Sequence, residues 1–212
     1  MAQAIDFYIS SHGFGHASRA IEVINAILAR RPETRIGVRT AAPRWLFDLT
    51  VKGKVTFSTL ETDTGVVQVD ALTLDEADSI RRAASFHNDL VTRAPSETRS
   101  LRELGAGLIV GDIPPLAFAV GAAAGIPSIG LGNFTWDWIY DGYRDWMSDG
   151  GRFIEQIRTA YSAADLALRL PMHGGLGMFH RVLDLPFIAR RTARDPQDVR
   201  RSLALPSDVP LV

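Results

Sequence analysis

The sequence predicts an α/β fold, a Rossmann-like parallel sheet of about seven strands with helices on both faces. Short β-rich segments alternate with helical patterns along the chain, which is typical of a parallel sheet with crossover helices. The segment "AIDFYIS" at 4–10 is too densely apolar for a strand with one wet face, so it indicates burial on both sides. With 212 residues, 46% of them hydrophobic, the chain is long enough for one large domain. We expect residues 1–212 to form a single lobe.

Each predicted element follows from a local pattern. The strand pattern recurs at 4–10, 35–40, 54–60, 106–112, 126–131, 164–171 and 185–190. Helical spacing or a helix-start signal marks about 16–31, 43–50, 75–104, 114–125, 153–162 and 195–201. Pro95 predicts a break within 75–104, and the segment 61–75 has no clear period. The last apolar run, 203–212, begins to look like a strand, so we expect the N-terminal lobe of a longer protein.

Composition excludes several classes of protein. Lys plus Arg (23) nearly balances Asp plus Glu (24), so nothing indicates a nucleic-acid partner. The arginine-rich stretch from Arg190 to Arg201 has interleaved acids, which favours a solvated helix face. Without cysteine the chain has no disulfide, thiolate zinc site or Cys nucleophile, and we expect a cytoplasmic protein. No apolar run reaches the roughly 20 residues of a transmembrane segment.

The first strand is followed by a loop, "SSHGFGH", that contains two glycines and two histidines. Gly13 and Gly15 form a G-x-G, but the rest of the dinucleotide fingerprint and the P-loop lysine are missing. His16 falls at the start of the next helix, where it would serve as a general base near neutral pH or simply cap the helix. His12 is a weaker candidate, and Arg19 would meet a phosphate or carboxylate or remain solvated.

A carboxylate, Asp112, ends the predicted strand 106–112. If this strand lies near the first one, Asp112 and His16 share one rim of the sheet, since parallel strands end at the same edge. A carboxylate bonded to one imidazole nitrogen fixes the tautomer and makes the other nitrogen more basic. Alternatively, Asp112 caps the following helix.

The segment "NFTWDW" follows the next strand at the same rim. Asn133 and Asp137 are possible partners of sugar hydroxyls, and Phe134, Trp136 and Trp138 would either form a stacking wall or anchor the next helix. The irregular segment 61–75 adds Thr64, Gly65, Gln68 and Asp70 as candidates for the same cleft.

Taken together, these segments resemble the N-terminal lobe of a two-domain GT-B-fold glycosyltransferase. The likeness is greatest to the glycosyltransferase-like N-terminal region of plant-type L-arabinokinases and to bacterial stand-alone relatives. The motifs that carry it span His12–Arg19, Gly65–Asp75, Asp112–Pro115 and Asn133–Tyr140. One departure is Ser11, where the related loop has glycine, and a serine there would restrict the approach of a ligand to the backbone.

The resemblance implies a general base at His16 and its carboxylate partner at Asp112. It also implies a substrate site holding a sugar acceptor, formed by His12, Gly13, Gly15, Arg19, Gln68, Asp70, Asn133, Trp136 and Asp137. No metal is implied, the donor would be a UDP-linked or other nucleotide sugar, and a C-terminal donor-binding lobe would lie outside this chain. We therefore expect an inverting, metal-independent glycosyltransferase whose isolated lobe is inactive. The alternatives are a non-catalytic module that binds a sugar or nucleotide sugar for regulation, and a nucleotide-sugar epimerase.

Overall fold

A seven-stranded parallel sheet forms the centre of the computed structural model, which describes residues 4–147, 150–190, 192 and 194–210. Its strand order is β3-β2-β1-β6-β7-β8-β9. The strands are β1 (Ala4–Ile9), β2 (Arg35–Thr40), β3 (Thr56–Thr59), β6 (Ala106–Asp112), β7 (Ser128–Gly132), β8 (Leu166–Arg169) and β9 (Val182–Asp184). The predicted fold class is therefore confirmed.

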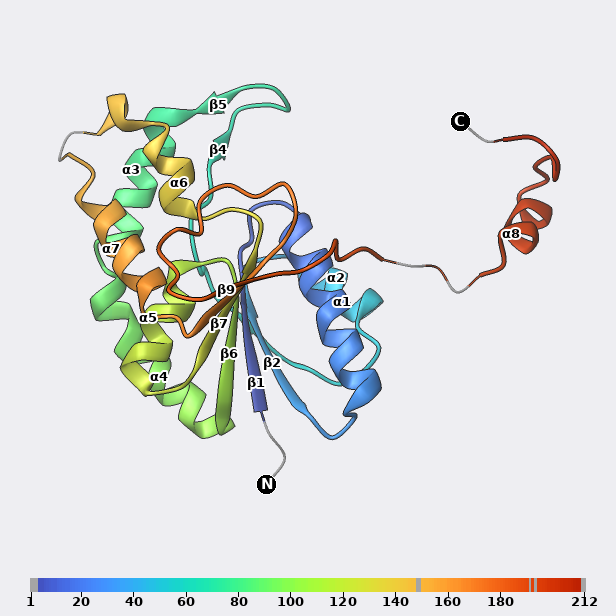
Figure 1. The fold of residues 1–212 in the computed structure, drawn as a ribbon, viewed down its shortest axis with the longest axis horizontal. Coiled ribbons are helices and arrows are strands. Elements are labelled where there is room, and N and C mark those ends of the chain that lie inside the picture. The colour runs from blue at the N-terminus through green and yellow to red at the C-terminus, as the bar shows by residue number, and fades with distance from the viewer. Residues whose placement is uncertain (1–3, 148–149, 191, 193, 211–212) are drawn as a thin grey trace.

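Helices cover both faces of the sheet (Figure 1). One face carries α1 (Gly15–Arg30) and α2 (Arg44–Thr50). The other carries α3 (Glu76–His87), α4 (Leu90–Leu104), α5 (Pro115–Ala124), α6 (Trp136–Asp141) and α7 (Arg152–Ser162). Two further short helices are η1 (Arg144–Trp146) and α8 (Pro196–Ser202), and α8 lies away from the sheet.

Two apolar cores result, one on each side of the sheet. Phe7 and Ile9 of β1 pack with α1 and α2, whereas Tyr8, between them, faces the core under α3 to α7. All three side chains are fully buried. This alternation is what a strand needs when helices cover both of its faces.

The strand order reverses between β1 and β6, because the chain runs outward from β1 to β3 and then returns to the other side of β1. The two strands are paired in parallel, with Ile9 opposite Asp112. In open α/β sheets, ligands bind beyond the carboxyl ends of the strands at such a reversal. The loop after β1 and the residues after β6 therefore hold the favoured position for a site.

Three local predictions were wrong. The break in the helical region falls at residues 88–89 and not at Pro95, which lies within α4 on its exposed side. The seventh strand is Val182–Asp184 and not 185–190, because its ladder ends with the bond from Leu185 N to Arg169 O, and Pro171, the next residue on the β8 side that would donate to it, has no N–H. The segment 61–75 contains a short hairpin, β4 (Val67–Gln68) and β5 (Leu74–Asp75).

The C-terminal segment forms no strand over its described residues 203–210, and residues 211–212 lie outside the described part. As predicted for a solvated helix, α8 has no buried residue, and residues 191 and 193 of the arginine-rich stretch also lie outside the described part. Within the described residues, no helix combines the length and the apolar character that crossing a membrane requires.

Candidate functional site

The predicted His–Asp pair forms at the reversal of the strand order. Asp112 is the last residue of β6, and His16 lies in the first turn of α1, directly after the loop that leaves β1. The bond from Ser10 N to Asp112 O, at 2.9 Å, continues the β1–β6 ladder one residue beyond β1. Neither side chain caps a helix: the N-cap residue of α1 is Phe14 and that of α5 is Pro114. The capping alternatives are therefore wrong for both residues.

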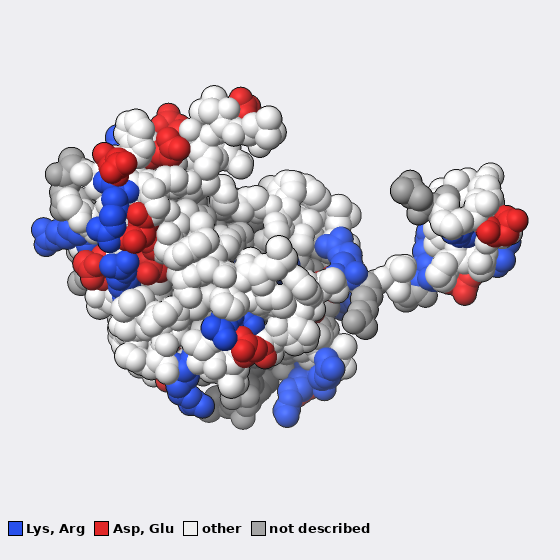
Figure 2. Space-filling model, turned by 45° about the horizontal axis from the view of Figure 1, so that its top comes forward, with Lys and Arg blue, Asp and Glu red and all other residues white. Residues whose placement is uncertain are grey.

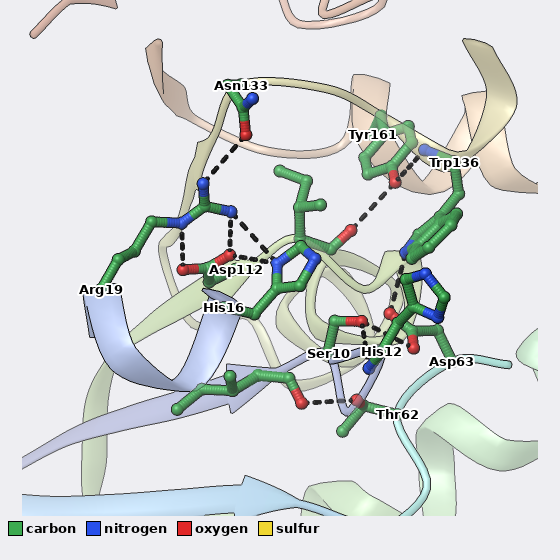
Figure 3. Close-up of polar contacts among 12 residues, drawn as sticks. Ser10, His12, His16, Arg19, Thr62, Asp63, Asp112, Asn133, Trp136 and Tyr161 are labelled. Atoms are coloured by element: carbon green, nitrogen blue, oxygen red, sulfur yellow. Dashed lines mark hydrogen bonds and ion pairs between the residues drawn. The ribbon is translucent and has the colours of Figure 1, made fainter. Parts of the chain in front are cut away.

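The Asp112 carboxylate is fully buried and accepts hydrogen bonds from two side chains of α1 (Figure 3). His16 Nδ1 lies 2.8 Å from Oδ1, while Arg19 donates from Nε to Oδ2 at 2.7 Å and from Nη2 to Oδ1 at 2.5 Å. Burial alone would raise the pKa of Asp112, but the charge and hydrogen bonds of Arg19 and the bond from His16 outweigh burial and lower it. Asp112 is therefore ionised at neutral pH.

The ionised carboxylate determines the tautomer of His16. A carboxylate only accepts hydrogen bonds, so we assign the ring proton to Nδ1, where it is donated to Asp112. Arg19 Nη2, at 3.1 Å from Nδ1, is also a donor and so makes no hydrogen bond to that nitrogen in this tautomer. Nε2 carries the lone pair, and none of the described residues bonds to it.

Although His16 is only 6% exposed, its free nitrogen is not enclosed. In the described part of the chain, the buried side-chain atoms without a partner are Tyr8 OH, both ring nitrogens of His87, Asp137 Oδ1 and Gln156 Oε1. His16 Nε2 is not one of these atoms and so retains some accessible surface. The site therefore leaves the Nε2 edge of His16 open to a ligand at the carboxyl ends of the strands.

Arg19 is part of this site and not a solvated surface residue. Its side chain is 15% exposed, and its Nη1 donates to Asn133 Oδ1 at 2.9 Å, beyond the end of β7. The guanidinium thus joins α1, β6 and the β7–α6 loop. Because Asn133 Oδ1 accepts this bond, its amide N–H groups remain available to donate to a ligand.

A second buried carboxylate, Asp63, was missed by the sequence analysis. Asp63 is 1% exposed and accepts hydrogen bonds from Ser10 Oγ at 3.0 Å and from Trp136 Nε1 at 2.8 Å (Figure 3). Burial, the largest effect, raises its pKa to about 6, against the lowering by the charge of His16 and by these two bonds. The only signal in the sequence was its place in a polar, aperiodic segment after a strand.

The aromatic segment is mostly structural. Trp136 is 1% exposed and stacks on Tyr140 with ring centroids 5.6 Å apart, so it is not the exposed stacking wall that one interpretation of the sequence requires. Trp138, in contrast, is 53% exposed. Asp137 is buried and pairs with Arg158 Nε at 3.3 Å, which directs it toward α7. Among these residues, Trp138 alone combines an aromatic ring with substantial exposure.

The remaining candidates lie in the loop before α1, at the start of α1 and on the β4–β5 hairpin. His12 is half-buried and packs edge-on against Trp136 with centroids 5.7 Å apart, and its pKa is lowered by burial and by the charge of His16. Gly13 has φ +70°, a value at which side chains are strained, whereas Gly15 begins α1. Gln68 and Asp70 are exposed on the β4–β5 hairpin, where Asp70 Oδ1 accepts bonds from the N–H groups of residues 72 and 73.

The β4–β5 hairpin projects beyond the body on the side of the carboxyl ends of the strands, and a notch separates the two (Figures 1 and 2). A cavity of about 640 Å³ lies at the opposite edge of the sheet, beside Ala4, Arg35 and Thr56, and shares no residue with the His16 site. Within the described residues, no group of three or more His, Cys, Asp or Glu side chains is placed to hold a metal ion.

The reversed parallel sheet, with its candidate site at the carboxyl ends of β1 and β6, is a Rossmann-like lobe of the kind found in the GT-B fold. The chain is 32% identical over 213 residues to L-arabinokinase from Arabidopsis thaliana, an alignment that covers 97% of this chain and 20% of that protein. The predicted resemblance is thereby confirmed. No protein-family model matches the chain.

Solved structures agree in fold. A UDP-glucosyltransferase from Polygonum tinctorium superposes with a TM-score of 0.56 at 13% identity, over 94% of this chain and 55% of that one. UGT2 from Phytolacca americana, complexed with UDP-2fluoro-glucose and pterostilbene, gives 0.57 at 13% identity, over 96% and 57%. UGT89C1 from Arabidopsis thaliana, complexed with UDP, gives 0.53 at 14% identity, over 96% and 56%. The chain thus spans just over half of each transferase and a fifth of the arabinokinase.

Proposed function

We propose that this chain is the acceptor-binding lobe of an inverting glycosyltransferase that uses a nucleotide sugar, with His16 as the general base. The observation that carries the proposal is the free Nε2 of His16, in a ring whose Nδ1–H is held by the buried Asp112 carboxylate. A neutral imidazole oriented in this way accepts a proton near neutral pH. The site lies where ligands bind in sheets of this topology.

In the proposed reaction, the acceptor hydroxyl gives its proton to His16 Nε2 while its oxygen attacks the anomeric carbon of the donor. The bond from that carbon to the diphosphate oxygen breaks, and the nucleoside diphosphate leaves with the electron pair. Asp112 keeps its hydrogen bond to Nδ1–H and stabilises the imidazolium that forms. The proton transfer itself needs no metal ion, and the proposal includes none.

The hydrogen bonds already made by Asp112 support inversion. A retaining double displacement needs a carboxylate that is free to attack the sugar. Both oxygens of Asp112 are bonded to Arg19 and His16, and the side chain is fully buried. The accessible group is therefore the imidazole nitrogen, which supports a single displacement.

We further propose a UDP-linked donor, bound mainly by a second lobe outside this chain. UGT89C1, complexed with UDP, shares this fold over just over half of its length, which supports both parts of the proposal. On this interpretation residues 1–212 form one lobe that has no transferase activity alone. Measurable sugar transfer by the isolated chain would contradict this interpretation. A chain without cysteine also fits a site of action in the cytoplasm.

A second candidate is a binding or regulatory module without catalysis. The observation that favours it is the match to a fifth of a protein named as a kinase. In addition, Arg19 compensates the charge of Asp112, which reduces the field that the carboxylate exerts at His16. In this case the site would bind a sugar or nucleotide sugar with no proton transfer at Nε2.

The test uses the full-length protein that contains this chain. Calorimetry with UDP-, GDP- and TDP-sugars identifies the donor, and product analysis with and without acceptors detects transfer or epimerisation. His16→Ala is expected to lower the transfer rate by about 10²- to 10⁴-fold with donor binding retained, whereas the exposed His180→Ala serves as the matched control. Full activity of His16→Ala would overturn the assignment of the base, and binding without any transfer in the unmodified protein would favour the module.

A further inference from the structure

Three segments of the carboxyl rim meet at Asp63. One oxygen of its carboxylate accepts the hydrogen bond from Ser10, just beyond β1, and the other accepts the indole N–H of Trp136, at the start of α6 (Figure 3). Asp63 itself belongs to the segment that leads from β3 to the β4–β5 hairpin. None of the cations in the described residues forms an ion pair with it, so both of its partners are neutral donors.

The Trp136 indole then contacts the rings around the two histidines. Phe134 packs edge-on against Trp136 with centroids 5.2 Å apart, and His16 packs edge-on against Phe134 at 5.5 Å. His12 contacts Trp136 directly. Edge-to-face contacts favour particular ring planes, so a change in the plane of Trp136 alters the packing of both imidazoles. Asp112 restrains His16 through Nδ1, and the edge-to-face contact with Phe134 restrains its ring as well.

We propose that Asp63 is a positioning residue for His16: its bonds to Ser10 and Trp136 fix the indole, and the indole fixes His16 through Phe134. Asp63 is buried and acts without touching a substrate. The consequence for catalysis rests on the proposed function, whereas the effect on the order of the His16 ring does not. The two consequences are therefore measured separately.

Two substitutions separate the hydrogen bonds of Asp63 from its charge. Asn in Asp63→Asn still accepts the Trp136 N–H through its oxygen and donates its own N–H to Ser10 Oγ, so both links persist without the charge. Asp63→Ala removes both links. Trp136→Phe keeps an aromatic ring but loses the indole N–H, so it removes the hydrogen bond to Asp63 while Asp63 itself is unchanged. Asp6→Asn is the matched control, a buried aspartate of β1 bonded to Arg39.

The first measurement is NMR of the His16 Nδ1–H and the Trp136 indole N–H, with exchange against solvent. In Asp63→Ala and in Trp136→Phe, exchange of the His16 ring proton should accelerate by about tenfold or more, because the ring loses the packing that holds it against Asp112. In Asp63→Asn and Asp6→Asn it should stay within about twofold of the unmodified protein. Should Asp63→Ala fail to fold, Trp136→Phe decides. Unchanged exchange at His16 in the link-breaking variants would overturn the proposal.

The second measurement is transfer by the full-length protein. Asp63→Ala should lower kcat about tenfold or more with the KM for the acceptor within about threefold, and Asp63→Asn should restore most of kcat. A larger effect on KM than on kcat would contradict a role in positioning the base. If the unmodified protein transfers no sugar, the proposed function fails, and the exchange measurement still decides whether Asp63 orders His16.

Discussion

Two buried aspartate–arginine pairs lie on adjacent strands of the sheet, and only one of them orients an imidazole. In the first, Arg39 of β2 donates from Nε to Asp6 of β1 and from Nη1 to Glu97 and Ser100 of α4. In the second, Arg19 of α1 donates to Asp112 of β6 and to Asn133. Both networks place one guanidinium between a strand and neighbouring segments.

The first network contains no imidazole, whereas the second includes His16, whose Nε2 has no partner among the described residues and keeps accessible surface. The carboxylates also differ in pKa. Burial raises the pKa of Asp6 against one bond from Arg39, but two bonds from Arg19 and one from His16 lower that of Asp112 despite its burial. The comparison teaches that a buried ion pair marks a candidate site only where it orients a group that is still free to react.

The largest expected effect is that of Asp112→Ala. The substitution leaves Arg19 without its carboxylate, and breaking a buried pair from one side costs about 3–5 kcal/mol of the free energy of unfolding. It also removes the acceptor that holds the His16 tautomer, so transfer should be lost with it. Urea denaturation followed by circular dichroism measures the stability. A loss below about 1 kcal/mol would show that Asp112 and Arg19 are not coupled as described.

The second expected effect is a pH dependence due to Asp63, the buried carboxylate without a cation. Its pKa of about 6 in the folded chain lies above the ordinary value of 3.8, so the folded chain binds the proton more tightly than the unfolded chain does. The corresponding stability is therefore fully present below about pH 4 and is lost as the pH rises through 6, by about 3 kcal/mol in all.

The measurement for Asp63 is the difference in unfolding free energy between the unmodified protein and Asp63→Asn from pH 4 to pH 8. Asn does not titrate, so the opposing contributions of Asp6 and Asp112 cancel in this difference. The unfolding free energy of the unmodified protein, relative to that of Asp63→Asn, should fall as the pH rises across that interval. A difference that is independent of pH would mean that Asp63 titrates as an ordinary exposed carboxylate.

The third expected effect is smaller because the first network contains a second acid. Asp6→Ala leaves Arg39 paired with Glu97 and bonded to Ser100, so we expect a loss of about 2–3 kcal/mol in unfolding free energy. Binding of a nucleotide sugar or acceptor by the full-length protein should not change. If Asp6→Ala is folded at the assay temperature but binds the ligand less well, the Asp6–Arg39 network contributes to the site, as the network around Asp112 does.

How far the sequence could predict the structure depends on the kind of contact. Central strands such as 106–112 were assigned correctly because burial on both faces leaves an apolar run with a clear end. The pairing of His16 with Asp112 followed from topology alone, since parallel strands next to each other end at one edge. Helix spacing placed Arg19 one turn after His16, yet its depth of burial depends on Asp112, which is 93 residues away.

The buried, hydrogen-bonded roles of Asp63 and Trp136 could not be predicted from the sequence, because each side chain is the hydrogen-bond partner of the other. A carboxylate in an aperiodic segment is ordinarily solvated, and a tryptophan at a rim is equally suited to stacking and to packing. Only the fold brings the indole N–H to the Asp63 carboxylate, across 73 residues of sequence. Similarly, Pro95 is compatible with α4 because it lies on the exposed side, which its sequence neighbours do not reveal.

The last expected effects concern two glycines: Gly37, beside the Asp6–Arg39 network, and Gly65, beside His12. A Cβ at Gly37 would lie 2.5 Å from Asp6 Oδ1, whereas one at Gly65 would lie 2.6 Å from His12 Nδ1. Asp6 Oδ1 is held by Arg39, and Asp6 Cγ would lie 2.7 Å from the added Cβ, so Gly37→Ala should cost about 2–3 kcal/mol. At Gly65 the φ of +60° costs about 1 kcal/mol for alanine, and His12 must shift as a whole, because its Cβ would lie 2.8 Å from the added Cβ.

Gly65→Ala should therefore lower the free energy of unfolding by more than about 1 kcal/mol while it displaces the His12 ring from Trp136. Thermal denaturation gives the stability, and NMR contacts between the two rings give the displacement. The Asp63–Trp136 bond should persist, because it does not pass through His12. If Gly65→Ala costs as much as Gly37→Ala, the His12 side of the rim is as rigid as the Asp6 network, and His12 is then as fixed in place as His16.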